Sequence, residues 1–203
     1  MSPVNPEAPA KRKTALFGGT FDPVHYGHLR LAEWVKKHLE LDSVFFIPIR
    51  IHPFNKRKNI TPAIHRLNML RQAVGKMKDF EVSSIELDRD EVSYTVDTLR
   101  TLHQAMPDRE FYLLIGDDNL PEFRIWKEPE EIAKLAKIVV FRRSGLQENS
   151  KEKYADFIFV DNPLIKISSS EIRERLRHGL PVEEFIPPAV LNYIRQHRLY
   201  ILQ

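Results

Sequence analysis

The chain alternates short apolar segments with amphipathic ones, and this alternation constrains its fold more than any other feature. The amphipathic segments repeat their apolar residues every three or four positions, the spacing of one helix face. The predicted strands span residues 14–19, 43–49, 80–87, 110–116, 137–143 and 156–161. The predicted helices span residues 28–39, 63–77, 94–106, 128–136, 168–179 and 187–200. Strands that alternate with helices favour an α/β fold with a doubly wound parallel sheet.

Length and composition narrow the class of protein. The chain has 203 residues, which fits one domain over residues 14–203 whose last part, from about residue 168, is helical. Residues 1–13 are rich in Pro and Ala and are predicted to be a disordered extension. Cysteine is absent, which excludes disulfides and thiolate metal sites. The sequence leaves the oligomeric state open, a homo-oligomer included.

Location and partners follow from hydropathy and charge. No apolar run approaches the roughly 20 residues that cross a membrane, and the N-terminus lacks the apolar core of a signal peptide. We therefore expect a cytoplasmic protein with no membrane partner. The net charge of +3 is compatible with small polyanions and with RNA, and does not decide between them.

The stretch LFGGTFDPVHYGH joins the first predicted strand to the first predicted helix. Gly18 and Gly19 allow a tight turn and the close approach of a ligand, and the helix N-terminus favours an anion. His25 and His28, three residues apart, project from one side of the first turn and can donate hydrogen bonds to phosphoryl oxygens. The dinucleotide fingerprint and the P-loop are absent. The alternative is a glycine turn followed by two surface histidines.

A second predicted anion site stands near the C-terminus, where Ser168, Ser169 and Ser170 precede a helical segment. Three successive hydroxyls supply more donors than one helix cap requires. Arg173 follows within a turn and can fork onto phosphate oxygens. The alternative is an ordinary capped helix, because Ser-x-x-Glu is also a capping box.

These two motifs, GGTFDPVHYGH and ISSSEIR, resemble the H-x-G-H and I-S-S-x-x-I-R signatures of a nucleotidyltransferase superfamily. The segments SYTVDTLR, LIGDDNL, VVFRRSG and IPPAVLNYIRQHRLY resemble, in order, segments of the bacterial nicotinate mononucleotide adenylyltransferases. The resemblance implies a Rossmann-like nucleotidyltransferase fold. It also implies transfer of AMP from ATP to nicotinate mononucleotide in NAD biosynthesis, giving deamido-NAD and pyrophosphate.

The acceptor phosphate, with a second pKa of about 6, needs no general base. Mg²⁺ would bridge the phosphates and water with few protein ligands, and no protein metal site is predicted.

The resemblance also assigns roles to residues. His25 and His28 are implied as catalytic. The implied ATP-binding residues are Gly18, Gly19, Thr20, His25, His28, Asp118, Ser168, Ser169 and Arg173. The implied binders of the mononucleotide are Phe21, Lys56, Thr95, Trp126 and Arg143.

Several of these assignments have structural alternatives. Asp118 matches an acid that accepts from a ribose hydroxyl, or it belongs to a solvated acid pair at a helix start. Trp126 would stack on the pyridine ring, or it packs in the core. Thr95 matches a position near the nicotinate carboxylate, or it is a helix N-cap. Lys56 takes the place of a lysine in the family pattern P-P-H-K. Arg143 is a phosphate contact or an exposed charge at a strand end.

Two other functions remain in view. Another adenylyltransferase of the superfamily, acting on pantetheine phosphate or nicotinamide mononucleotide, would share the phosphate motifs. Pantetheine-phosphate enzymes, however, lack SYTVDTLR and the region of Trp126. An RNA-binding module is the second alternative, because HPFNKRKN and RERLRH are basic. These runs are more simply solvated faces or phosphate-loop residues, so we expect no nucleic-acid partner.

Overall fold

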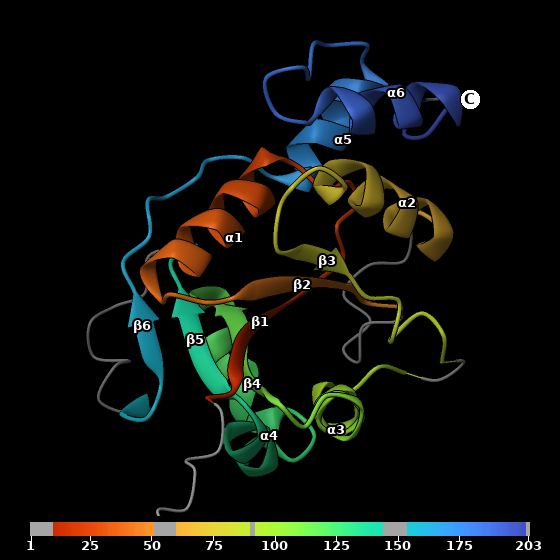
Figure 1. The fold of residues 1–203 in the computed structure, drawn as a ribbon. Helices are drawn as coiled ribbons and strands as arrows, with labels where there is room; N and C mark the ends of the chain where they lie inside the picture. Colours follow the sequence, from red (N-terminus) through yellow and green to blue (C-terminus); the bar gives the residue numbers. More distant parts are fainter. Residues whose placement is uncertain (1–9, 51–59, 90–91, 144–153, 202–203) are drawn as a thin grey trace, which may run out of the picture.

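The computed structural model describes residues 10–50, 60–89, 92–143 and 154–201. Their core is one six-stranded sheet in which every pairing is parallel, in the order β3-β2-β1-β4-β5-β6 (Figure 1). The strands are β1 (Arg12–Gly19), β2 (Ser43–Pro48), β3 (Phe80–Val82), β4 (Arg109–Gly116), β5 (Lys137–Phe141) and β6 (Ile158–Val160). The predicted doubly wound α/β fold is confirmed.

Helices cover both faces of the sheet. They are α1 (Tyr26–His38), α2 (Ala63–Val74), α3 (Thr95–Ala105), η1 (Asp117–Ile125, a 3₁₀ helix), α4 (Pro129–Leu135), α5 (Ser169–Arg177) and α6 (Pro188–Gln196). Ala15 and Phe17 of β1 belong to the core that contains α1 and α2, whereas Leu16 belongs to the core that contains α3 and α4. This alternation is the period of two that a strand imposes on its side chains. Figure 1 shows the two layers on opposite sides of the strands.

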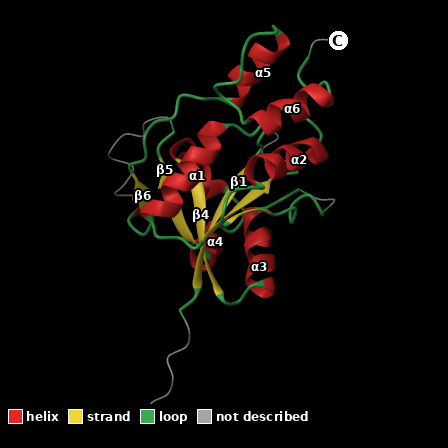
Figure 2. Ribbon diagram, turned by 45° about the horizontal axis from the view of Figure 1, so that its top comes forward, coloured by secondary structure: helices red, strands yellow, loops and turns green. Residues whose placement is uncertain are grey.

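The strand order reverses direction at the centre of the sheet. From β1 the chain moves outward through β2 and β3, and then returns to β4 on the other side of β1. The carboxyl ends of β1 and β4, at Gly19 and Gly116, therefore flank the switch point where ligands bind in such folds. In Figure 2, α5 and α6 gather with α2 beyond one end of the sheet.

Most observed elements differ from the predicted ones by a few residues at their ends, and three further differences concern β1, β3 and η1. β1 begins at Arg12, two residues inside the segment predicted to be a disordered extension. β3 ends at Val82 rather than residue 87, since the chain turns at Ser84, whose carbonyl accepts from the amides of Leu87 and Asp88. The helix η1 follows β4 directly, and a helix start at the acid pair had been considered only as the alternative for Asp118. No helix within the described ranges is long and apolar enough to span a membrane.

Candidate functional site

A cavity of about 1000 Å³ lies at the carboxyl ends of the strands. The turn after β1, the first turns of α1, α3 and α5, and the ends of β4 and β5 contribute to its wall. Most of the predicted site residues line it: Gly18, Gly19, Thr20, Phe21, His25, His28, Thr95, Asp118, Trp126, Arg143, Ser168 and Ser169. Arg173 is not among the lining residues, and Lys56 lies outside the described residues.

The two glycines after β1 serve different purposes. A Cβ on Gly19 would come within 2.9 Å of the Phe21 ring, so only glycine lets that ring fold back under the turn. A Cβ on Gly18 would meet no atom within 4 Å, so the absence of a side chain keeps the cavity open there. Phe21 has a positive φ of 49°, a conformation that costs a non-glycine residue free energy. Its ring compensates by packing against Phe46 and His28, with centroids 5.7 and 5.0 Å away.

His25 and His28 form a stacked pair at the start of α1. Their ring centroids are 3.7 Å apart with an interplanar angle of 26°. Gly27 makes this possible, because a Cβ there would lie 2.8 Å from Nδ1 of His25. The backbone amide of His25 donates to Nδ1 of His28 at 3.3 Å. That nitrogen is therefore an acceptor, and the proton of a neutral His28 ring is on Nε2, where it can be donated.

Both imidazoles are neutral near pH 7. Burial, together with a smaller effect of the positive charge of Arg143, lowers the pKa of His25 to about 3. Burial also holds the pKa of His28 well below its usual value, with smaller contributions from His25 and Arg143. Nδ1 of His25 is buried and has no hydrogen-bond partner among the described residues. This atom faces the first turn of α1 itself, close to Gly27 and the backbone of His28, so it belongs to the start of the helix rather than to the open part of the cavity.

The serines of the second motif differ from the expectation. Oγ of Ser168 caps α5 by accepting from the amide of Glu171 at 3.1 Å. Oγ of Ser169 donates its hydrogen to the carbonyl of Pro23 at 3.0 Å. Oγ of Ser170 accepts from the guanidinium of Arg173 at 2.9 Å. Only Ser169 has therefore donated its hydroxyl hydrogen to the protein, since the oxygens of Ser168 and Ser170 act as acceptors in these bonds. The donors that α5 still offers to an anion are the backbone amides of its first turn and the hydroxyl hydrogens of Ser168 and Ser170.

Arg173 points into the protein. It is 7% exposed, and its guanidinium donates to the carbonyl of Asp22 at 2.6 Å. The carboxylate of Asp22 accepts from the hydroxyl of Tyr200 at 2.7 Å, and Arg66 donates to the carbonyl of Thr20 at 2.9 Å. These side chains fix the turn of the first motif from α5, from α2 and from the C-terminal end of the chain. Of these side chains only Arg173 was predicted as a site residue, and it was assigned to ATP.

Asp118 and Arg143 meet at the ends of β4 and β5. Nη1 of Arg143 is 3.1 Å from Oδ2 of Asp118, and both side chains are substantially exposed. The neighbouring Asp117 is buried and accepts from the backbone amide of Arg143 at 3.1 Å, so its role is to join the two strand ends. A Cβ on Gly116 would collide with Asp118. Of the predicted acid pair, only Asp118 has its carboxylate at the cavity.

The other end of the cavity is formed around the start of α3. Thr95 is the first helical residue and Tyr94 occupies the N-cap position, so the N-cap alternative for Thr95 is wrong. Trp126 ends η1 and packs against Phe123, with centroids 5.4 Å apart. The next residue, Lys127, lies 4.8 Å above the ring of Tyr94, which holds the end of η1 against α3. Glu86, a buried acid that also lines this cavity, was not predicted as a site residue.

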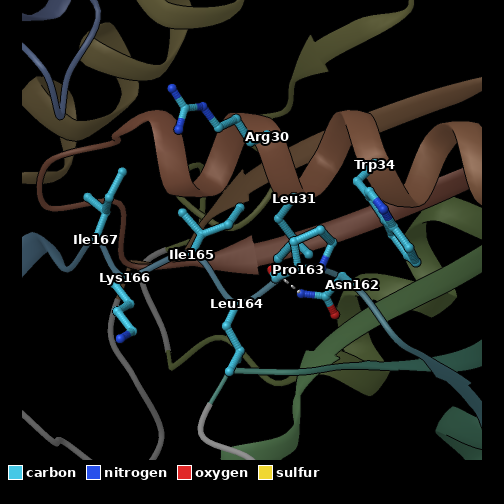
Figure 3. A pocket seen from close by; sticks show the side chains of 9 residues that line it. All are labelled: Arg30, Leu31, Trp34, Asn162, Pro163, Leu164, Ile165, Lys166 and Ile167. Atoms are coloured by element: carbon cyan, nitrogen blue, oxygen red, sulfur yellow. Dashed lines mark hydrogen bonds between the residues drawn. The ribbon is translucent and has the colours of Figure 1, made fainter.

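A smaller cavity of about 400 Å³ lies between α1 and the segment 162–167. Figure 3 shows Leu31 of α1 pointing toward this segment, with Trp34 at one end and Arg30 pointing away. The two cavities share Leu31, Ile165 and other residues of the segment. The segment is therefore a thin wall of the larger cavity.

Comparisons with known proteins agree with this geometry. Residues 16–175 match the sequence profile of the family described as "Cytidylyltransferase-like". A protein of Bacillus licheniformis named "Probable nicotinate-nucleotide adenylyltransferase" is 37% identical over 189 residues, which is 93% of this chain and 98% of that one. A protein of Dehalococcoides mccartyi with the same name is 40% identical over 197 residues, covering 93% and 97% of the two chains.

Solved structures show the same fold. The Plasmodium falciparum nicotinic acid mononucleotide adenylyltransferase complexed with NaAD superposes with a TM-score of 0.79 and 22% sequence identity. The similarity covers 93% of this chain and 97% of that one.

Proposed function

The chain belongs to the nicotinate-nucleotide adenylyltransferases of the cytidylyltransferase-like family, and we propose that it transfers AMP from ATP to nicotinate mononucleotide. The observation that carries this proposal is the neutral histidine pair at the switch point. It combines two stacked imidazoles that line the cavity with a donor on Nε2 of His28. Neutral donors at a helix N-terminus suit a polyphosphate, because the backbone already supplies positive potential.

The reaction is a displacement at the α-phosphorus of ATP. A phosphate oxygen of nicotinate mononucleotide forms the new bond, the bond from the α-phosphorus to the bridging oxygen of the β-phosphate breaks, and pyrophosphate leaves. The attacking phosphate is mostly dianionic at pH 7, since its second pKa is about 6, so no side chain has to remove a proton. The protein must align two phosphates and stabilise the negative charge that moves onto the leaving group.

His28 is the main catalytic donor in this scheme, with His25 beside it. Arg143, at the edge of the same cavity, adds a positive charge that can move between Asp118 and a phosphate. The backbone amides at the start of α5 would hold the β- and γ-phosphates. Trp126 and Thr95 would contact the pyridine ring and its carboxylate at the far end of the cavity.

Mg²⁺ fits this site as a partner of the phosphates. Within the described residues no three His, Asp or Glu side chains gather as a metal cluster. Mg²⁺ keeps several waters and is usually held by substrate phosphates and one or two carboxylates. Asp118 is the exposed carboxylate at the cavity that could serve. When bound, the ion would neutralise part of the phosphate charge.

A pyrophosphate-release assay with ATP and a panel of acceptors tests the proposal. The panel contains nicotinate mononucleotide, nicotinamide mononucleotide and pantetheine phosphate. We expect the first to give the highest kcat/KM. Release with pantetheine phosphate alone would assign the chain to another branch of the superfamily. Failure with all three, together with RNA binding that weakens steeply with salt, would instead favour the RNA-binding alternative. A cytoplasmic location stays a prediction.

A further inference from the structure

Glu86 is a buried carboxylic acid at the end of the cavity where α3 begins. It is 7% exposed and lines the cavity together with Ser93, Thr95 and Thr98. Oε1 accepts a hydrogen bond from the hydroxyl of Thr98 at 2.9 Å. Oε2 is buried and has no hydrogen-bond partner within the described part of the chain. The proposed mechanism gives this group no task.

A buried carboxyl group with one unsatisfied oxygen disfavours its own charged form. Burial is the largest influence on Glu86 and raises its pKa, while the hydrogen bond from Thr98, the charge of Arg89 and the hydroxyl of Ser93 act in the opposite direction. The guanidinium of Arg89 is engaged by the carbonyl of Asp97 and the hydroxyl of Thr101.

Among the described residues, Arg50 and Lys127 are two further cations near this end of the cavity, and each has a partner of its own. Arg50 donates to the carbonyls of Leu87 and Arg89 on the same loop. Lys127 pairs with the carboxylate of Asp97 at 2.9 Å. None of these contacts of Arg50 and Lys127 is made to the carboxyl group of Glu86.

We propose that Glu86 is a specificity-determining residue, whose carboxyl group must be neutral for the anionic pyridine substituent of the substrate to occupy this end of the cavity. This inference rests on the proposed function, which brings a carboxylate to the start of α3. Two carboxylates that share one poorly solvated site cannot both ionise without a large cost. A carboxamide carries no charge and is indifferent to the state of Glu86. The enzyme's preference for acid over amide is therefore a function of pH.

The test is the ratio of kcat/KM for nicotinate mononucleotide to kcat/KM for nicotinamide mononucleotide, measured from pH 5 to pH 9. Both substrates carry the same phosphate and contact the same histidines. The pH dependence that these groups impose on kcat/KM is therefore the same for both substrates and cancels in the ratio. In the wild type we expect the ratio to fall by on the order of tenfold as pH rises through the raised pKa of Glu86. Tenfold corresponds to about 1.4 kcal/mol of repulsion.

Glu86→Gln keeps the oxygen that accepts from Thr98 and cannot ionise. We expect its ratio to stay at the low-pH value of the wild type across the whole range. Glu33→Gln, which changes an exposed acid on α1, is the matched control and should follow the wild type. A flat ratio in the wild type, or an unchanged slope in Glu86→Gln, would overturn the proposal.

Proton uptake gives a second test that needs no variant. Binding of the acid raises the affinity of Glu86 for a proton, so above its pKa the wild type should take up more protons with the acid than with the amide. Calorimetry in two buffers of different ionisation enthalpy measures this difference, and equal uptake would also overturn the proposal. Absence of turnover with either mononucleotide would instead contradict the proposed function.

Discussion

The two phosphate motifs contain similar donors, but the folded protein uses them in opposite ways. In the first motif the imidazoles of His25 and His28 face the cavity, and Nδ1 of His25 has no partner among the described residues. In the second motif the hydrogen of the Ser169 hydroxyl and two N–H groups of Arg173 are donated to the protein itself. In the proposed mechanism the first motif therefore supplies the donors for the chemistry, while Ser169 and Arg173 of the second motif hold the first in place.

The strongest test of this difference is His28→Ala. Loss of a preorganised donor to charge that develops in the transition state should lower kcat by about 10²-fold or more. The fold should survive, because the ring lines the cavity and is not part of the hydrophobic core. Steady-state kinetics with circular dichroism as the check on folding measures both. His28→Gln retains a donor and should lose less. A well-folded His28→Ala enzyme with nearly normal kcat would assign the chemistry elsewhere.

The sequence predicted which residues line the site better than it predicted the hydrogen bonds between them. Spacing alone located the helix α1, predicted over residues 28–39, and the helix α5 behind the three serines, of which Ser168 is the cap. The comparisons confirm the family that the two motifs implied. All of these depend on local residue patterns, which one chain displays without its fold.

The rest depends on contacts between segments far apart in the sequence. Arg173 was assigned to ATP, but it lies against Asp22, 151 positions earlier in the chain. Glu86 fell within a segment predicted as a strand, and became a cavity residue only because the chain turns at Ser84. The helix η1, which carries Trp126 at its end, has a proline in its interior and no helical period that could have predicted it.

Arg173→Met tests whether the second motif stabilises the fold or binds ATP. Methionine keeps the buried stem but removes the donors to the carbonyl of Asp22 and the hydroxyl of Ser170. Loss of these bonds should lower the free energy of unfolding by about 1–3 kcal/mol. The effect on kcat should be smaller than that of His28→Ala. Urea denaturation and kinetics on the same preparation measure the two. A raised KM for ATP with unchanged stability would make Arg173 a direct phosphate ligand instead.

The pH dependence of the free energy of unfolding tests whether His25 of the first motif is buried in its neutral form. The pKa of His25 is about 3 in the folded protein and about 6.5 when unfolded, so below pH 6.5 the unfolded chain binds more protons. The contribution of His25 to the free energy of unfolding is therefore fully present above pH 6.5 and decreases as pH falls toward 3. One such histidine accounts for about 1.4 kcal/mol of loss at pH 5.5.

Urea unfolding at pH 7.5 and 5.5 measures this loss. His25→Asn should reduce the difference between the two pH values by about that amount, and His38→Asn, at an exposed position of the same helix, is the matched control. If His25→Asn had the same pH dependence as the wild type, the histidine would not be buried in its neutral form.

The smallest expected effect belongs to Ser169→Ala. The hydroxyl hydrogen is already donated to the carbonyl of Pro23, so the side chain has no donor left for a phosphate, while the backbone amide survives the substitution. We expect KM for ATP to stay within about threefold of the wild type and the free energy of unfolding to fall by about 1 kcal/mol. Ser168→Ala removes the cap of the same helix without touching Pro23, and separates loss of the cap from loss of the link to the first motif. A tenfold or larger rise in KM for ATP in Ser169→Ala alone would show that the hydroxyl turns toward the nucleotide when it binds, and the two motifs would then share the chemistry after all.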